Sequence, residues 1–364
     1  MGEVSVGAAL SRRGVSRRDF LKFCTAMAAT LALPSAMVPR IARALEKQAK
    51  PVAIWLEFSD CAGDTESTLR AYRPTISQIV LDVLSVEYHE TIMAPSGKAA
   101  EKSKKDVMKN NRGKYIAIVE GAIPTKDGGI YCTIGGETAL DIAREACGNA
   151  LATLAVGSCA VWGGIASASP NPTGSVGVRE AVPSAPNVVN LPGCPVNVEN
   201  VTATIVHYLT FGSFPVLDGN LRPLFGYGKR IHDNCERRMH FDAGQFVRHF
   251  GDEGARLGWC LYEVGCKGPE AYYNCPTVRW NERTSWPVQA GHPCFACAAN
   301  NNWDAMGPIY SRLPNVPGAG YQLTADRIGL GVAAAAAIGV AAHAVIRGIR
   351  ASEPEEPPER SEKE

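Results

Sequence analysis

Five apolar segments in the first half of the chain are almost continuous, a pattern that severely limits the possible fold. They are VAIWLEF (52–58), QIVLDVLSVEY (78–88), YIAIVEG (115–121), LATLAVG (151–157) and NVVNLPG (187–193). The stretches ETALDIAREACGNA (137–150) and NVENVTATIVHYLTF (197–211) have helical patterns. Apolar strands between helices are typical of a parallel sheet that is covered on both faces. We therefore expect an open α/β sheet here.

Reactive and charged residues follow these segments where the strands should end. Cys61 and Asp64 come after the first segment, Glu120 closes the third, and Cys159 and Cys194 follow the last two. Parallel strands place their carboxyl ends at one edge, and binding sites in open α/β sheets form outside that edge. The sequence thus predicts that these five residues converge, although they are far apart in the chain.

Cysteines are concentrated after residue 215, where regular periodicity falls and glycine, proline and aromatic residues increase. Six of the twelve cysteines lie there: Cys235, Cys260, Cys266, Cys275, Cys294 and Cys297. A segment with little core of its own needs cross-links or bound metal. Disulfides are one option, but removal of Cys24 with a leader leaves an odd number. Iron–sulfur ligation, with four ligands for each cubane, agrees better with thiols at strand ends.

The N-terminal sequence SRRDFLKF (16–23) precedes an apolar run, and ARA (42–44) offers small residues for cleavage. This pattern is typical of a twin-arginine export signal, with a basic amphipathic helix as the alternative. Because twin-arginine export carries folded proteins, the signal agrees with a metal centre that is assembled before export.

A second apolar run, IGLGVAAAAAIGVAAHAVI (328–346), contains His343 and has about the length that a bilayer requires. Arg347 and Arg350 follow it, as expected for a cytoplasmic end, although Arg327 on the other side weakens this bias. A buried core helix is the alternative. The polar, proline-rich tail after this run is expected to be disordered.

The charge balance argues against nucleic acid as a partner. The chain has 37 Lys and Arg against 36 Asp and Glu, a formal net charge of +1. Its lysine-rich stretch, residues 97–114, also contains acids and is predicted to be a solvated helix and loop. A nucleic-acid-binding chain would be expected to carry a basic face.

Four motifs together resemble the small subunit of membrane-bound nickel–iron hydrogenases. They are PGCP (192–195), RIHDNCERRMHFDAGQFV (230–247), CLYEVGCKGPEAYYNC (260–275) and GHPCFACAANNNWD (291–304). The resemblance covers nearly the whole chain, from the export signal to the terminal apolar run. It implies three iron–sulfur clusters in a line, with a nickel–iron centre in a separate large subunit.

The resemblance also implies a ligand set for each cluster. The proximal 4Fe-4S cluster would be held by Cys61, Asp64, Cys159 and Cys194, the distal 4Fe-4S cluster by His232, Cys235, Cys260 and Cys266, and the medial 3Fe-4S cluster by Cys275, Cys294 and Cys297, with Pro287 at its open corner. His232 and Cys235 are three positions apart, as ligands on one turn would be, and an imidazole ligand raises a cluster's potential. Cys132 and Cys147 are left over and are expected to be buried small hydrophobic residues.

Asp64 departs from the usual family pattern, which has a cysteine there. A carboxylate binds iron through oxygen as a harder ligand, so we expect an altered site, with a free carboxylate as the alternative. Gly63 and Gly164 stand where some oxygen-tolerant members have two additional cysteines, so a six-cysteine proximal cluster is not expected. Glu120 and Asp60 are candidates for proton relay or cluster tuning, with helix capping as the competing interpretation of Glu120.

The expected function is electron transfer from hydrogen oxidation to a membrane acceptor of cytochrome b type, in an enzyme that is active only with its large subunit. A soluble hydrogen sensor and a disulfide-rich exported binding protein are the alternatives. The resemblance also allows a dimer of heterodimers, held at the exported face of the cell membrane. The expected parts are a signal peptide (1–44), a flavodoxin-like domain (45–220), a cysteine-rich iron–sulfur domain (221–320), a transmembrane helix (326–347) and a disordered tail (348–364).

Overall fold

The computed structural model describes residues 8, 14–72, 75, 83–313 and 325–351. Met1–Ser311 form one compact unit and Arg312–Glu364 form a second. Residues 352–364 of the expected disordered tail (348–364) lie outside the described residues, as do residues 78–82 of the second expected strand. Residues 348–351 are helical, so disorder from residue 348 is not observed.

The main sheet of the first unit has five parallel strands in the order β2-β1-β3-β7-β9. The strands are β1 (Val52–Glu57), β2 (Ser85–His89), β3 (Ile116–Glu120), β7 (Ala152–Val156) and β9 (Val188–Leu191). Counted along the chain, this is the order 2-1-3-4-5 of flavodoxin-like sheets. The expected parallel α/β sheet is therefore confirmed. Two antiparallel pairs are much shorter: β4 (Ile123–Pro124) with β8 (Ser175–Val176), and β5 (Thr133–Ile134) with β6 (Glu137–Thr138).

Strands β1, β2, β3 and β7 contribute to two hydrophobic clusters, one on each face, whereas β9 contributes to one of them. In β1, Ala53 and Trp55 belong to one cluster, whereas Ile54 and Leu56 belong to the other. This follows from the alternation of side chains along a strand. Burial on both faces explains why the strand sequences are almost uninterrupted apolar runs.

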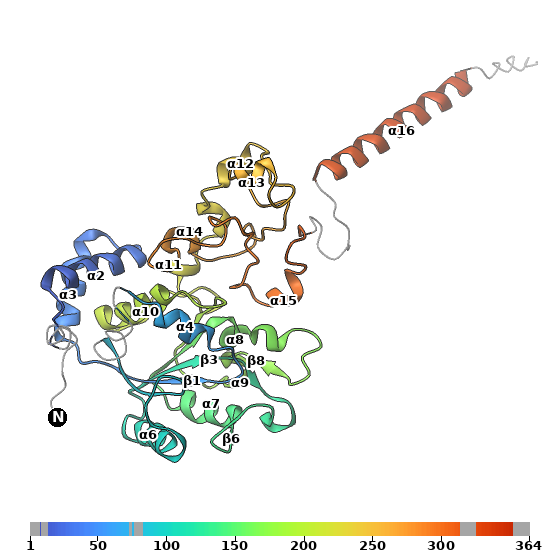
Figure 1. Ribbon diagram of the computed structural model, residues 1–364. Helices are drawn as coiled ribbons and strands as arrows, with labels where there is room; N and C mark the ends of the chain where they lie inside the picture. Colours follow the sequence, from blue (N-terminus) through green and yellow to red (C-terminus); the bar gives the residue numbers. More distant parts are fainter. Residues whose placement is uncertain (1–7, 9–13, 73–74, 76–82, 314–324, 352–364) are drawn as a thin grey trace, which may run out of the picture. The chain divides into compact units, whose positions relative to one another are not determined.

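Helices cover both faces of the sheet. They are α4 (Gly63–Leu69), α6 (Gly97–Asn110), α7 (Ala139–Gly148), α8 (Gly157–Trp162), α9 (Val178–Ala181) and α10 (Val198–Phe211). Figure 1 shows α6 and α7 on one side, with α4 and α10 on the other. The predicted helix α10 begins after Asn197, whose side chain accepts a hydrogen bond from the Glu199 N–H, and ends at Gly212 with φ of 71°. Both are standard helix caps.

The cysteine-rich segment has little regular structure. It contains α11 (Leu224–Tyr227), η5 (Ile231–Asn234), α12 (Arg238–Asp242), α13 (Glu253–Arg256), α14 (Cys275–Val278) and α15 (Asn302–Ala305). Tyr227 and Tyr273 stack at 5.0 Å between ring centroids, and both belong to the same hydrophobic cluster as α10. The Tyr227 hydroxyl donates to the Pro192 carbonyl at 2.8 Å. The hydrophobic residues of this segment therefore pack in the same core as one face of the sheet.

All twelve cysteines lie in the described part of the chain, and all are free thiols. The alternative of a disulfide scaffold is therefore wrong for this fold. Cys147 is fully buried and Cys132 is partly buried, which agrees with the packing role that we expected for this pair.

The expected leader forms α2 (Arg17–Thr30), the short helix η1 (Ser35–Met37) and α3 (Val38–Lys47). Ser16 caps α2 by accepting a hydrogen bond from the Asp19 N–H at 3.1 Å. These helices belong to the compact unit, because α2 and α3 pack on each other and on α10.

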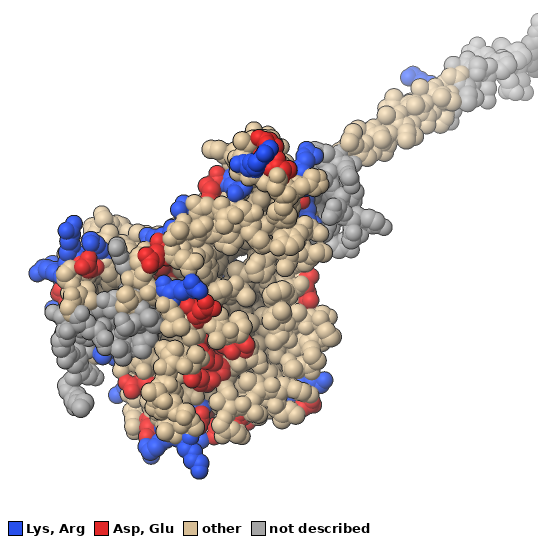
Figure 2. Space-filling model, viewed as in Figure 1, with Lys and Arg blue, Asp and Glu red and all other residues tan. Residues whose placement is uncertain are grey.

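The second unit contains the long helix α16 (Ala325–Ala351). Its stretch Gly329–Gly348 has a mean hydropathy of 2.0, none of it is buried, and it is long enough to cross a bilayer. The alternative of a buried core helix is therefore wrong. Figure 2 shows α16 with almost no charged atoms on the visible face apart from a basic group near one end.

We predict that truncation after Gln322 leaves the fold of the first unit intact, because the described α16 side chains are not buried. The unfolding temperature of the detergent-solubilised complex should change by less than about 2 °C. Calorimetry of the full-length and truncated complexes tests this. A much larger decrease would show that α16 is part of the folded core.

Candidate metal-cluster sites

The loops after β1, β7 and β9 bring three cysteines to the carboxyl edge of the sheet. Cys61 lies between β1 and α4, Cys159 is in α8 just after β7, and Cys194 follows β9. Burial, followed by the neighbouring Asp64 and Cys61, raises the pKa of the Cys159 thiol to about 11. Burial, followed by the neighbouring Cys297, Cys159, Asp64 and Cys61, raises the pKa of the Cys194 thiol to about 12. The predicted convergence of these residues is observed.

Asp64 is held in a narrow space in the first turn of α4, with 8% of the residue exposed. One carboxyl oxygen accepts a hydrogen bond from the Val196 N–H. The other faces Gly157, where an added Cβ would be only 1.8 Å from it. Burial, followed by the nearby Glu120, raises the pKa of Asp64 to about 8. Burial thus favours the neutral carboxyl, whereas a bound cation would favour its ionised form.

Glu120 ends β3 and caps the adjacent helix α4. One of its oxygens accepts hydrogen bonds from the backbone N–H groups of Asp64 at 2.9 Å and Thr65 at 3.1 Å. The other accepts from the Thr65 hydroxyl at 2.6 Å and from the Trp55 indole at 3.0 Å. A carboxylate at a helix N-terminus satisfies free N–H groups and the helix dipole. The capping interpretation of Glu120 thus has direct structural support, and a relay or tuning role stays a proposal.

Two more acids lie beside Glu120. Glu57, Asp60 and Glu120 bring one oxygen each within 4.8 Å of one another. Burial raises the pKa of Asp60 to about 7, and the neighbouring Glu120 and Glu57 contribute to this shift. Asp60 therefore holds a proton near neutral pH.

The expected distal ligands gather in the cysteine-rich segment. His232 lies in η5, and Cys235 follows it as the C-cap. Burial, followed by the nearby Cys266 and Cys235, raises the pKa of the Cys260 thiol to about 11. His232 packs edge-on against Phe241 at 4.6 Å, and burial lowers its pKa, which favours the neutral imidazole that metals bind.

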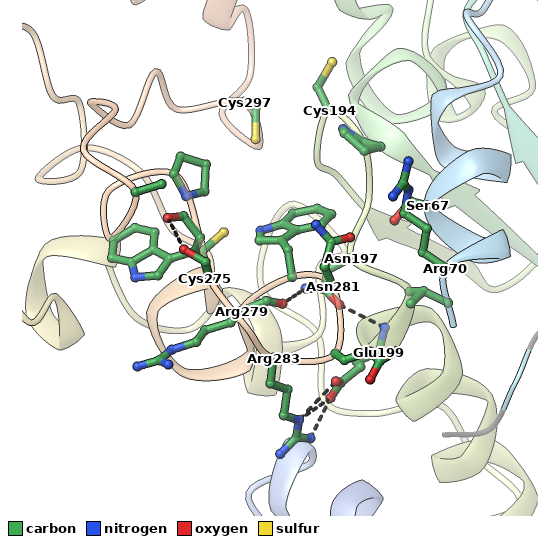
Figure 3. A pocket seen from close by; sticks show the side chains of 18 of the residues that line it. Ser67, Arg70, Cys194, Asn197, Glu199, Cys275, Arg279, Asn281, Arg283 and Cys297 are labelled. Atoms are coloured by element: carbon green, nitrogen blue, oxygen red, sulfur yellow. Dashed lines mark hydrogen bonds and ion pairs between the residues drawn. The ribbon is translucent and has the colours of Figure 1, made fainter. Parts of the chain in front are cut away.

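The expected medial ligands share a cavity of about 650 Å³. Cys275, Cys294, Cys297 and Pro287 line it together with Cys194 from the sheet edge. Figure 3 shows Cys194 and Cys297 near each other at the top of the view, with Cys275 below them.

The medial set of expected ligands adjoins both the proximal and the distal set. The Cys194 N–H faces the Cys297 thiol, which links the proximal and medial sets. Cys266 lies close enough to raise the pKa of the Cys294 thiol, and the Lys267 N–H donates to the Cys294 carbonyl at 2.6 Å, which links the medial and distal sets.

The donor groups suit clusters of several irons better than single ions. Among the described residues, only Glu57, Asp60 and Glu120 place three potential ligand atoms within 4.8 Å of one another. The cysteine sets are therefore wider than a single-ion site, as a polynuclear cluster requires. Their thiols are soft donors, which iron–sulfur clusters use. The residues present therefore fit such clusters.

Lys267 is a site residue that the sequence analysis did not identify. It is 1% exposed, and its ammonium donates to the carbonyls of Pro308 at 3.2 Å, Ile309 at 3.4 Å and Ser311. The only signal in the sequence is its position directly after Cys266. Gly164 has φ of 54°, and an added Cβ would lie 2.3 Å from the Cys159 sulfur, so a side chain there requires rearrangement.

Comparisons with known proteins identify the family. The family model for the C-terminal part of the NiFe/NiFeSe hydrogenase small subunit matches residues 227–310, and the model "NADH ubiquinone oxidoreductase, 20 Kd subunit" matches residues 61–208. The chain is 45% identical over 345 residues to the quinone-reactive Ni/Fe-hydrogenase small chain of Wolinella succinogenes, covering 93% of this chain and 97% of that one. This protein belongs to the family of nickel–iron hydrogenase small subunits.

Other relatives agree. The uptake hydrogenase small subunit of Azotobacter vinelandii is 44% identical over 341 residues, which cover 94% of this chain and 95% of the relative. The structure of a Ni-Fe-Se hydrogenase from Desulfomicrobium baculatum matches with a TM-score of 0.69 and 34% identity, covering 72% of this chain and 99% of that chain. Membership of the family implies iron–sulfur clusters in this chain and a partner large subunit with a nickel–iron centre.

We predict that Glu120→Gln lowers the free energy of unfolding by about 2–3 kcal/mol, because charge-assisted hydrogen bonds to Asp64, Thr65 and Trp55 weaken together. Chemical denaturation of the complex measures the change. Glu145→Gln, on an exposed position of α7, is the matched control and should cost less than about 0.5 kcal/mol. Equal stability of the two variants would contradict the capping role of Glu120.

Proposed function

We propose that this chain is the electron-relay subunit of a hydrogen-oxidising enzyme and passes electrons from its large subunit to a membrane acceptor. The observation that carries the proposal is that the medial ligand set adjoins the other two, at Cys194 with Cys297 and at Cys294 with Cys266. Clusters bound at these sets would supply one-electron carriers. In this proposal, the contacts between neighbouring ligand sets determine the order in which electrons pass through the clusters.

The proposed ligand sets are those that the family resemblance implies. They are Cys61, Asp64, Cys159 and Cys194 for a proximal 4Fe-4S cluster, Cys275, Cys294 and Cys297 for a medial 3Fe-4S cluster, and His232, Cys235, Cys260 and Cys266 for a distal 4Fe-4S cluster. Exposure of Cys61 supports a proximal site that opens toward a partner subunit. Pro287 lines the medial cavity and offers no donor atom, which supports a three-iron cluster there.

We propose that Asp64 ligates iron in the proximal set. Its proximity to Cys159, Cys194 and Cys61 supports this role. The competing role is structural, because one Asp64 oxygen accepts the Val196 N–H and thereby ties α4 to the loop before α10. Oxygen ligation would leave that hydrogen bond in place if the second oxygen bound the metal. The variants below separate the two roles.

The acids at the sheet edge support a proton path beside the proximal set. The Thr65 hydroxyl lies 2.6 Å from a Glu120 oxygen and 2.8 Å from a Glu57 oxygen, and it can donate its one proton to either. Glu57 in turn is a charged neighbour of Glu90, whose pKa burial raises to about 7. The pKa values of Asp60 and Glu90 are both raised to about 7, so this group of acids contains two carboxyls suited to proton exchange near neutral pH. In our proposal this group carries protons and Glu120 also caps α4.

The proposal of a membrane acceptor is supported by the apolar helix α16 and by the name of one relative. Gly329–Gly348 is long and apolar enough to span a bilayer, and one relative is named quinone-reactive. We propose a cytochrome b-type acceptor beside α16, with His343 in a packing role.

The leader supports export through the twin-arginine route, so the folded unit would lie on the exported face of the cell membrane. The domain boundaries given above remain part of this proposal, as does a dimer of heterodimers.

Three substitutions at Asp64 should distinguish ligation from structural support. Asp64→Asn keeps an acceptor for the Val196 N–H but is a poor iron ligand, so we expect iron loss from the proximal cluster with little loss of fold stability. Asp64→Ala should lose iron as well, and Asp64→Cys should retain four irons at a shifted potential. Iron analysis and potentiometric electron paramagnetic resonance (EPR) measure these outcomes. Full cluster occupancy at an unchanged potential in Asp64→Asn and Asp64→Ala would make the carboxylate a structural residue only.

Pro287→Cys should convert the medial cluster from three irons to four, because the new thiolate would reach the open corner of the cavity. An added iron and an added anionic ligand should lower the cluster's potential. EPR spectroscopy of the oxidised enzyme measures the loss of the 3Fe-4S signal. Ala290→Cys, which also faces this cavity, is the matched control and should keep that signal. An unchanged signal in Pro287→Cys would show that the corner is assigned wrongly.

A further inference from the structure

The apolar face of the leader helix α2 is buried in the folded unit. Phe20, Phe23, Cys24 and Met27 are all less than 9% exposed and belong to the hydrophobic cluster that also contains α10 and the sheet. The two arginines at its start are exposed. An export signal must present its apolar run to other molecules, but here that run is covered by the protein's own core.

Helix α10 provides the surface that receives the leader. Seven consecutive residues of α10, 200–206, are buried, so the helix is covered all round over almost two turns. The sheet covers one side, while α2 and α3 pack against another (Figure 1). The Arg40 guanidinium also lies 4.8 Å from the centre of the Phe211 ring, a cation–π contact between α3 and the end of α10.

A polar contact joins the leader to the cysteine-rich segment. Arg283 donates to Glu199 at 3.0 and 2.6 Å and to the Thr30 hydroxyl at 3.3 Å, and Thr30 also lies 3.4 Å from Glu199 (Figure 3 shows the Arg283–Glu199 pair). The Glu199 side chain is only 13% exposed, so water screens this ion pair less than a surface pair.

The loop that carries Arg283 is strained. Arg279, Asn281, Glu282 and Arg283 all have φ between 48° and 62°, a region that residues other than glycine rarely adopt. The same loop lines the cavity with the expected medial ligands, and Met27 of the leader lines it as well. The leader thus contacts a part of the protein that forms only when the cysteine-rich segment has folded.

We propose that α10 and the 279–283 loop form a docking surface for the chain's own leader, and that docking withholds the apolar part of the export signal in the folded precursor. This rests on the proposed twin-arginine function of the leader. Docked and released leaders are two states of one precursor, and the export machinery selects the released state. The exposed arginines remain accessible in both states.

Hydrogen exchange of the purified precursor, in complex with its large subunit, tests the docking. Backbone amides of residues 20–31 should be protected in the wild-type protein. Arg283→Gln, which keeps the leader sequence unchanged, should increase their exchange rate about tenfold through loss of charge-assisted hydrogen bonds. Thr30→Val should act in the same direction. Arg144→Gln, which removes an exposed ion pair on α7, is the matched control and should leave these amides unchanged.

Export is measured separately, as the rate at which the precursor is processed in a pulse–chase experiment. Arg283→Gln should be processed faster than the wild type and Arg144→Gln at the wild-type rate. If wild-type residues 20–31 exchange as fast as an unfolded peptide while α7 is protected, the docking proposal fails. If the leader is released in Arg283→Gln but processing is not faster, docking does not withhold the signal. Normal processing of an Arg17→Lys/Arg18→Lys precursor would instead refute the twin-arginine route and leave the docking result standing.

Discussion

Because β1, β3, β7 and β9 run parallel, the loops that follow them open at the same edge of the sheet, and every contact at the proximal set depends on this. Glu120 strengthens the arrangement by joining the end of β3 to the first turn of α4 through two backbone N–H groups. That turn carries Asp64. The position of one carboxyl at the proposed cluster thus depends on the hydrogen bonds of another at the end of a neighbouring strand.

The stability of the cysteine-rich segment depends on how the cost of burying its thiolates compares with the gain from binding iron. Its packing comes from the shared face of the sheet, and its buried thiols have raised pKa values, such as about 11 for Cys235 and Cys297. A thiol must lose its proton to bind iron, and burial opposes that loss. Iron therefore has to offset the cost of burying these anions. The fold of this segment and the binding of its clusters should consequently be linked.

The sequence predicted those features that arise from local patterns. The apolar strands, the helices α7 and α10, and the convergence of Cys61, Cys159 and Cys194 all followed from periodicity and from parallel topology. Long-range contacts could not be predicted in this way. The leader's apolar run gave no indication that it packs on α10, and the burial of Lys104 within a lysine-rich helix contradicts the expectation of a wholly solvated helix. The Lys104 ammonium lies 5.3 Å from the centre of the Tyr88 ring, a contact that depends on how α6 meets β2.

The central claim is that three clusters lie in one row, with the medial cluster between the other two. Redox titration of the purified heterodimer by EPR, combined with iron analysis, tests it most directly. The account predicts about 11 cluster irons per small subunit, from two four-iron clusters and one three-iron cluster. It also predicts that the medial signal is broadened by both neighbours, whereas the proximal and distal signals do not broaden each other. A missing cluster, or direct coupling of the proximal and distal clusters, would contradict the row.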